Sequence, residues 1–247
     1  MAAGGSGMST LALPQPVLAS IEGAIEFIFT PQSSSVTGGK KVGGLEQVIE
    51  LTVNQLEVTF LALALALFVA LPIGLYLGHR GAGELLAIGL GNAGRAIPEL
   101  ALIAFMAAAI GVGLLNVTIA LAVLGIPPIL TNAFVGIRQV DRGAVDAARG
   151  MGMSEFEILR RVEMPLAVPT LMTGIRGATI NILATATIAP LAGVLTLGDF
   201  IINRNVYGDD GVLAGAILVA LLALVLEFAL AGLQRLLTSK GLKLSPA

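Results

Sequence analysis

The chain has 247 residues, no cysteine and a formal net charge of −2, and 56% of its residues are hydrophobic, with a mean hydropathy of +0.92. This composition lies outside the range of soluble globular domains. The net charge excludes a basic nucleic-acid-binding surface, and the lack of cysteine excludes disulfides and thiolate chemistry. Because His79 is the only histidine, we expect no metal site, and we expect His79 itself to lie in an interfacial or cytosolic loop.

Three long stretches carry no charged residue, namely Val58 to Gly78, Leu100 to Ile137 and Gly177 to Gly198. About 20 residues of helix cross the hydrocarbon layer of a bilayer. A helix of a soluble protein would be interrupted by polar residues every three or four positions. The sequence therefore predicts an all-α fold, a polytopic membrane helix bundle.

The chain divides into five expected crossings, which are residues 53–78, 98–115, 116–137, 165–194 and 211–236. Pro98 suits the first turn of the second crossing, because its missing N–H has no helical partner there. Pro127 and Pro128 are expected to kink the third crossing. Gly74 and Gly78 form a pair of small residues that permits close approach of another helix.

The ends of the chain are expected to lie outside the transmembrane domain, which we place at residues 51–237. Residues 1–50 are expected to form a tail that contains a linker and an interfacial helix at residues 17–29. That helix is short and is interrupted by Glu22 and Glu26. If it crossed instead, there would be six crossings and the N-terminus would change sides. Residues 238–247 are expected to form a cytosolic tail.

The basic residues predict the orientation, because cytoplasmic loops carry an excess of Lys and Arg. With an outside N-terminus and an inside C-terminus, Lys40, Lys41 and Arg204 lie outside. A larger group then lies at the inner boundary: Arg80, Arg95, Arg138, Arg142, Arg149, Arg160, Arg161, Arg235, Lys240 and Lys243.

Charge is concentrated in one internal segment. Of the 14 Lys and Arg and 16 Asp and Glu residues, ten lie between Arg138 and Glu163. Within it, Ser154 and Glu157 have the spacing of a capping box, in which each side chain satisfies a free amide at a helix start. Gly152 permits a sharp turn just before this start. The segment predicts a short helix from Ser154 to about residue 162, closed off before the next crossing begins.

Phe156, Leu159 and Val162 are expected to form an apolar ridge on that helix. An ordinary inner loop made basic by the positive-inside rule explains the arginines of the segment. It does not explain the equal number of acids, the turn glycine and the capped helix. We therefore favour a docking element that inserts into a groove on another protein.

The stretch "DAARGMGMSEFEILRRVEMP" resembles the EAA loop of type I ABC importer permeases, whose pattern is E-A-A, three residues, G, nine residues, I-x-L-P. The resemblance extends from about Leu51 to Leu237. The matching positions are Asp146, Ala147, Ala148, Gly152, Val162, Met164 and Pro165. It implies a permease fold in which loop 139–164 couples to an ATPase through Asp146, Ala147, Ala148, Gly152, Ser154, Phe156, Glu157, Leu159, Val162 and Pro165.

The resemblance also implies partners and a location. These are a separate ABC ATPase subunit that holds ATP and Mg²⁺, an extracytoplasmic solute-binding protein, a second permease copy in a homodimer, and the lipid of a prokaryotic inner membrane. We expect no cofactor and no catalytic residue on this chain. The nearest approach to a phosphate-binding loop is "TGGKK", which fails because Ser34 and Lys41 stand where Gly and Ser or Thr are needed.

The stretch "GIRGATINILATATIA", from Gly174 to Ala189, is similar to the glycine betaine, choline and carnitine (osmoprotectant) group of these permeases. The chain has no Trp and only two Tyr residues, so an aromatic cage for a quaternary amine must come from a binding protein. Methionine or another small polar solute is the alternative cargo. A channel or secondary transporter without an ATPase is the alternative of a different class.

Candidate residues of the translocation path are Arg176, Asn181 and Thr185. Ionisable groups inside a membrane are costly, so they face a cavity or a partner. Arg176 either lines the path or pairs with Glu227, and the sequence leaves both open. The polar group Asp199, Arg204, Asp209 and Asp210 is expected to be solvated surface in an outer loop.

Overall fold

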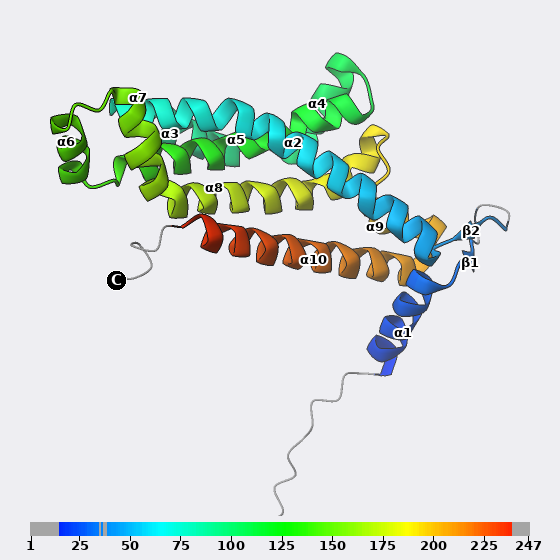
Figure 1. The fold of residues 1–247 in the computed structure, drawn as a ribbon. Helices are drawn as coiled ribbons and strands as arrows, with labels where there is room; N and C mark the ends of the chain where they lie inside the picture. The colour runs from blue at the N-terminus through cyan, green and yellow to red at the C-terminus, as the bar shows by residue number, and fades with distance from the viewer. Residues whose placement is uncertain (1–14, 35, 37–38, 239–247) are drawn as a thin grey trace, which may run out of the picture.

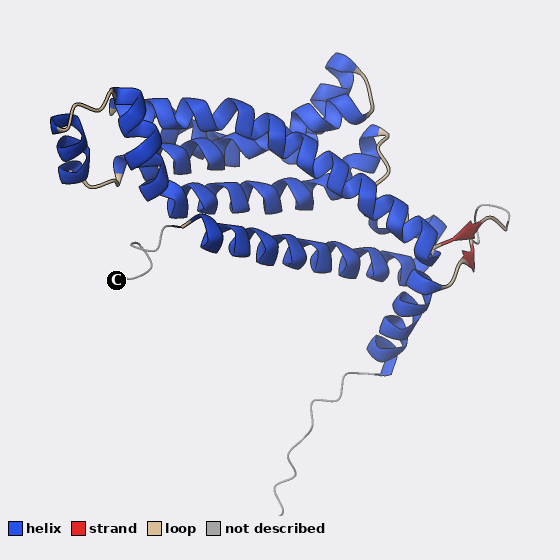
Figure 2. Ribbon diagram, viewed as in Figure 1, coloured by secondary structure: helices blue, strands red, loops and turns tan. Residues whose placement is uncertain are grey.

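The computed structural model describes residues 15–34, 36 and 39–238, and nearly all of these residues are helical (Figure 2). The first part of the predicted tail, residues 1–14, and nearly all of the predicted C-terminal tail, residues 239–247, lie outside the described residues. Lys240 and Lys243 of the orientation argument are among them. Within the described ranges, the long helices lie side by side and form a bundle (Figure 1).

Four helical stretches are long and apolar enough to cross a membrane. They are α2 (Gly44–Arg80), α5 (Leu114–Arg138), the run that contains α8 (Met164–Thr185) and the 3-10 segment η2 (Ala186–Ala192), and α10 (Arg204–Leu237). They agree with the first, third, fourth and fifth predicted crossings. α2 begins earlier than the sequence indicated, so the domain boundary that we expected at residue 51 falls inside this helix.

The second crossing differs from the prediction, because two short helices form it in series. α3 (Glu84–Arg95) and α4 (Glu99–Ile110) have 12 residues each, which gives each a length of about 18 Å. Both pack along α5: the Thr131 hydroxyl donates to the Ala87 carbonyl at 3.0 Å, and Ile103 of α4 belongs to the same buried cluster as residues of α5. The helix predicted over 98–115 therefore ends too late, because α4 ends at Ile110, and the prediction did not include α3 in this crossing.

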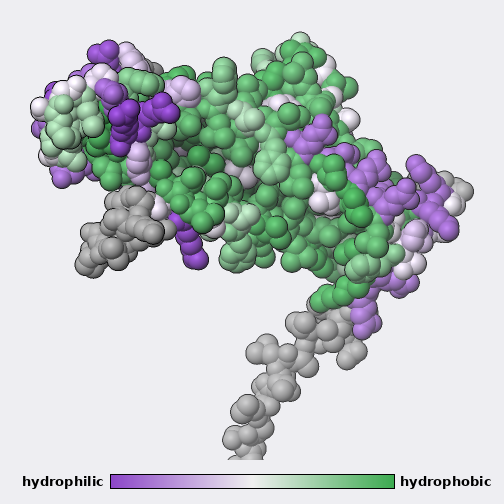
Figure 3. All heavy atoms as spheres, in the orientation of Figure 1, coloured by the Kyte–Doolittle hydropathy of each residue, from purple (hydrophilic) through white to green (hydrophobic). Residues whose placement is uncertain are grey.

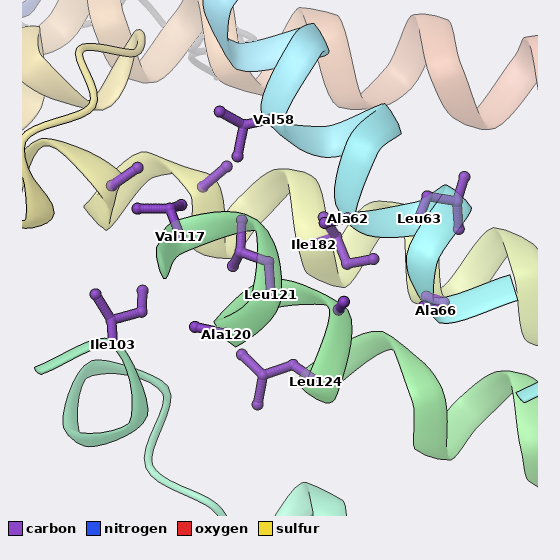
Figure 4. Close-up of a cluster of buried hydrophobic side chains, with 14 of the residues drawn as sticks. Val58, Ala62, Leu63, Ala66, Ile103, Val117, Ala120, Leu121, Leu124 and Ile182 are labelled. Atoms are coloured by element: carbon purple, nitrogen blue, oxygen red, sulfur yellow. The ribbon is translucent and has the colours of Figure 1, made fainter. Parts of the chain in front are cut away.

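The main core is made by small and branched side chains from three helices. Ala62 and Ala66 of α2, Leu121 of α5 and Ile182 of α8 are buried and meet at the centre of the bundle (Figure 4). α4 contributes the buried Ile103, which is 2% exposed, and its Leu102 and Met106 pack against the same cluster. The small residues let the backbones approach closely, as helices in lipid require, because lipid supplies no hydrophobic drive for their association.

Gly74 and Gly78 make the contact between α2 and α5, as the predicted small-residue pair indicates. A Cβ atom on Gly74 would lie 2.6 Å from Cβ of Ala133, and one on Gly78 would lie 2.8 Å from Cβ of Ile137. Real Cβ contacts are longer, so only glycine permits this separation of the two helices. The pair holds the start of the charged segment, which follows α5, next to the end of α2.

At the end of the bundle where α2 and α10 begin lie three further elements (Figure 1). They are α1 (Gln15–Phe29), a small antiparallel hairpin of β1 (Gln32–Ser33) and β2 (Lys41–Val42), and α9 (Gly198–Ile202). Phe27 packs edge-on against Phe200 and Tyr207. α1 leaves the bundle at an angle (Figure 1), and its 15 residues span about 22 Å, less than the hydrocarbon layer. This favours the five-crossing interpretation over six crossings.

The prediction that Asp199 is solvated is wrong. Asp199 is 7% exposed, and its carboxylate accepts hydrogen bonds from the Tyr207 hydroxyl at 2.5 Å and from the Asn203 amide at 2.6 Å. These donors compensate for the burial of the charge. Arg204 and Asp209 are exposed as predicted and form an ion pair with each other, but they lie in the first turns of α10 and not in a loop. Asp210, in the same helix, is half-buried.

The surface carries an apolar belt between two polar ends (Figure 3). One polar end covers the charged segment between α5 and α8, and the other covers the hairpin and the start of α2 (Figures 1 and 3). This distribution is what a bundle that crosses a bilayer requires, since polar groups gather where the chain meets water.

Candidate functional site

The charged segment forms a compact helical unit at one end of the bundle. It contains α6 (Arg142–Gly150), α7 (Glu155–Ile158) and the π-helical segment η1 (Leu159–Glu163). We call this unit the coupling unit. It lies opposite the hairpin and at the same end as the C-terminal end of α10 (Figure 1). Its bounds match the predicted loop 139–164, because α5 ends at Arg138 and α8 begins at Met164.

The turn into α7 has the geometry that the sequence predicts. Gly152 has φ +82°, the left-handed region that glycine adopts without strain. The Ser154 hydroxyl accepts from the Glu157 N–H at 3.4 Å, and the Glu157 carboxylate accepts from the Ser154 N–H at 3.1 Å. The predicted capping box is therefore confirmed. Two free amides at the helix start are satisfied, so the position of the next side chains is well defined.

The predicted end of this helix before the next crossing is wrong, because the helical run continues through η1 into α8. Pro165 has no N–H and stands in the first turn of α8, so the usual bond to the carbonyl four residues earlier cannot form. The Met164 N–H instead donates to the Leu159 carbonyl, five residues back. The chain changes direction sharply between α7 and α8 (Figure 1), as π-bulges and prolines allow.

The apolar ridge of the coupling unit is narrower than predicted. Phe156 is 69% exposed, but Leu159 and Val162 are half-buried against the cluster around Ile158, which is fully buried. Met151, which the sequence analysis did not single out, is 72% exposed. The large exposed apolar side chains of the coupling unit are thus Met151 and Phe156, on either side of the cap.

The other predicted coupling residues have different surroundings. Ala148 is buried in the cluster below the coupling unit, whereas Asp146 and Ala147 are exposed. Asp146 accepts from Arg149 at 3.3 Å. The Glu157 carboxylate takes part in the capping box. Val145 and Ala148 are the residues of α6 that are buried against this cluster.

A polar network ties the coupling unit to α2. His79 lies in the last turn of α2 and is 11% exposed, so the expectation of a loop position is wrong. Its Nδ1 lies 2.6 Å from Oε2 of Glu163, and its Nε2 lies 3.2 Å from Oε2 of Glu155. A neutral imidazole carries one N–H, so only the doubly protonated ring donates to both carboxylates. Glu163 is 1% exposed and depends on this partner.

Arg149 extends the network on the exposed side. It donates to the Glu155 carboxylate through Nε at 3.1 Å and through Nη2 at 3.2 Å. The Glu155 carboxylate raises the pKa of the Arg149 guanidinium further above its ordinary value. The network borders a hollow of about 470 Å³ that Tyr76, Phe156 and Leu159 also line. One polar network thus joins α2, α6 and α7.

The His79→Ala substitution is expected to lower the stability of the folded protein in detergent by about 3 kcal/mol, because it leaves the buried Glu163 carboxylate without a partner. The measurement is the thermal midpoint of the purified protein. The double variant His79→Ala/Glu163→Ala is expected to recover most of this loss, because it also removes the buried charge. A single variant that melts with the wild type, or a double variant that melts below the single one, contradicts this account of the network.

The three candidate path residues do not form one site. Arg176 contacts α10: it pairs with Glu227 and donates to the Gln234 side chain at 2.6 Å. Of the two alternatives, the structure favours the structural pairing. Thr185 is 3% exposed and donates to Asn181 at 3.2 Å, so it faces protein.

Of the three, Asn181 lines a cavity at the break between α3 and α4, which Glu99 also lines, whereas Arg176 lines a different hollow together with Ala231, Gln234 and Arg235 of α10. Glu99 cannot be recognised as a lining residue from the sequence, because its place at the start of the short helix α4 depends on the break in the second crossing.

Comparison with known proteins agrees with this arrangement. Residues 70–240 match the family described as "Binding-protein-dependent transport system inner membrane component". The carnitine transport permease protein OpuCB of Listeria monocytogenes is 39% identical over 78% of this chain and 88% of its own length. The glycine betaine/carnitine/choline transport system permease protein OpuCB of Bacillus subtilis is 36% identical over 78% of this chain and 89% of its own length.

Among solved structures, the MetNI methionine ABC transporter in an inward-facing conformation superposes on the fold. The TM-score is 0.67 at 22% identity, and the match covers 79% of this chain and 98% of that one. At this identity the likeness supports the fold alone. The family match covers well over half of the chain and contains the broken second crossing from α3 onward, the coupling unit and α10. This chain therefore belongs to the family of inner membrane components of binding-protein-dependent transport systems.

Proposed function

We propose that this protein is the subunit through which an ATP-driven importer carries a small quaternary amine, such as glycine betaine, choline or carnitine, across the membrane. Family membership supports the importer, and it leaves the alternative of a channel or secondary transporter without support. The similarity to permeases named for carnitine, choline and glycine betaine supports the cargo. The single observation on which the mechanism rests is the capped, exposed end of α7 at one end of the bundle.

The proposed partner at the coupling unit is an ABC ATPase subunit that holds ATP and Mg²⁺. Phe156 and Met151 offer exposed apolar side chains for a groove on that subunit, and charged groups of α6 and α7 surround them. Such a groove-and-helix contact takes most of its affinity from a few apolar anchors. The capping box and the glycine turn hold the anchors in place without the partner, which lowers the entropy cost of docking.

The proposed cycle transmits movement from the ATPase to the crossings. Since η1 joins α7 to α8 without a loop, a displacement of α7 moves the start of α8. The contacts of His79 with Glu155 and Glu163 pass the same displacement to α2. Two copies of the chain around a common path would then alternate between inward-open and outward-open states, with ATP and solute coupled through the bundle.

The proposed setting is the inner membrane of a prokaryote, with the coupling unit and the C-terminus in the cytosol. The excess of arginine around the coupling unit supports this orientation. The hairpin end then faces outward, where a solute-binding protein delivers the cargo. A homodimer and contact with lipid complete the proposed assembly, since the apolar belt needs lipid or a second copy to cover it.

The test is reconstitution of the protein with its ATPase and binding protein in proteoliposomes. We expect ATP-dependent uptake of glycine betaine, choline or carnitine, and no uptake when the ATPase is omitted. In parallel, these solutes and methionine are screened for thermal shifts of the binding protein. Uptake of methionine alone refutes the proposed cargo, and uptake without the ATPase refutes the importer.

A further inference from the structure

The break in the second crossing borders a cavity of about 290 Å³ between α3, α4, α5 and α8. This volume is at the lower end of the range for small-molecule sites. The cavity is separate from the hollow beside Phe156 and shares none of its lining residues. It lies where α3 ends and α4 begins, roughly halfway along α5, because it is lined by Pro127 and Pro128 in the middle of that helix.

Glu99 is the only charged residue that is seen to line this cavity, within the part of the chain whose side chains the structure describes. It occupies the first turn of α4 and is exposed. A carboxylate at this depth of a membrane is costly unless it faces a partner charge or a water-filled path. Within the same described side chains, Glu99 forms no ion pair. The energetic cost of a Glu99 carboxylate at this depth is therefore explained if its positively charged partner is present only for part of the transport cycle.

The rest of the lining is suited to a cation that donates no hydrogen bond. Pro127 and Pro128 have no N–H, so the carbonyls of Val123 and Leu124 lose their usual helical donors. Leu124 itself lines the cavity, together with Ile97. A trimethylammonium group, which donates no hydrogen bond, is accommodated by a negative charge and by apolar contact for its methyl groups, and the cavity supplies both through Glu99, Leu124 and Ile97.

We infer that this cavity is a transit site for the cationic head of the solute and that Glu99 is its counter-charge. The inference rests on the proposed function, because it takes a quaternary amine as cargo. Asn181 narrows the cavity from α8 and is held there by the Thr185 hydroxyl. One such site, without an aromatic cage, gives weak binding, which a path requires if the solute is to leave again.

The competing explanation is that Glu99 only stabilises the start of α4, since acids are favourable in the first turn of a helix. Glu84 is the matched control. It occupies the first turn of α3, is exposed, and does not line the cavity. If helix stabilisation is the whole role of Glu99, then Glu99→Gln and Glu84→Gln have the same consequences.

The experiment compares uptake of two solutes by the complete importer in proteoliposomes. Choline is a cation, whereas glycine betaine carries its own carboxylate close to the ammonium group. Glu99→Gln is expected to lower choline uptake about tenfold, the loss that one charge-assisted contact produces, and to lower betaine uptake less. Glu84→Gln is expected to leave both unchanged. Equal uptake by the two variants for both solutes overturns the inference.

A charge-rescue variant keeps the test decisive if Glu99→Gln folds poorly. The chain has no cysteine, so Glu99→Cys introduces a single site for thiol reagents. A methanethiosulfonate with a sulfonate group is expected to restore choline uptake, and one with an ammonium group is expected not to. Identical uptake after both reagents overturns the inference. If the wild-type importer carries neither choline nor betaine, the proposed cargo fails first, and the inference fails with it.

Discussion

The Phe156→Asp substitution is expected to abolish association with the ATPase subunit and to lower ATP-dependent uptake to background. Phe156 is 69% exposed, so the folded permease loses little when the ring is replaced. A docking groove on the partner loses its apolar anchor and gains a charge that must be desolvated, and anchor residues of this kind cost about 2–4 kcal/mol or more. The measurement is co-purification of the ATPase with the tagged permease.

Phe156→Leu is the matched control, because it keeps an apolar side chain at the same capped position, and it is expected to retain most of the association. Deletion of residues 154–162 is a poorer test, since it also removes the fully buried Ile158 and interrupts the run into α8. If Phe156→Asp recovers the ATPase in wild-type amounts, the docking role of α7 is refuted.

The Arg176→Met substitution is expected to lower the stability of the bundle by about 2 kcal/mol, the cost of leaving a partly buried charge without its partner. Arg176 contacts both Glu227 and Gln234, and in this way it attaches α8 to α10. Only 17% of the most apolar 18-residue stretch of α10 is buried inside the protein. A polar pair therefore contributes much of the attachment of α10 to α8. The measurement is the thermal midpoint in detergent.

The double variant Arg176→Met/Glu227→Leu separates a structural pair from a path-lining charge. If the pair is structural, the double variant recovers most of the lost stability, and uptake returns with it. Recovered stability without recovered uptake would instead assign Arg176 to the path, contrary to the arrangement described above.

Features that depend on residues close together along the chain were predictable from the sequence. The capping box at Ser154 and Glu157 and the turn at Gly152 follow from local backbone chemistry, and all are present. The three long uncharged stretches indicate three of the four full crossings, those of α2, α5 and α8, because a span of lipid imposes a fixed length on a helix. The start of the coupling unit follows from the end of the second uncharged stretch at Ile137, and the start of the next crossing follows from Pro165.

Several features that depend on tertiary contact were not predictable, although the close approach at Gly74 and Gly78 was. The segment from Glu84 to Arg95 is too short to span, and only its packing against α5 makes it half of a crossing. The position of Glu99 beside a cavity follows from that break. Asp199 was mistaken for solvated surface because its partner Tyr207 is supplied by the next helix. Leu159 was assigned to the ridge because helical spacing alone does not tell which side packs on the bundle.

The most direct test of the coupling mechanism uses the absence of cysteine from the natural chain. In a Phe156→Cys variant, a thiol-directed photo-cross-linker reports what lies against this position in membrane vesicles that contain the whole importer. We predict an adduct with the ATPase subunit, formed only when the cytosolic face of the vesicle is accessible to the reagent. An adduct with the solute-binding protein, or labelling only from the opposite face, would contradict the assignment of α7 as the contact with the motor.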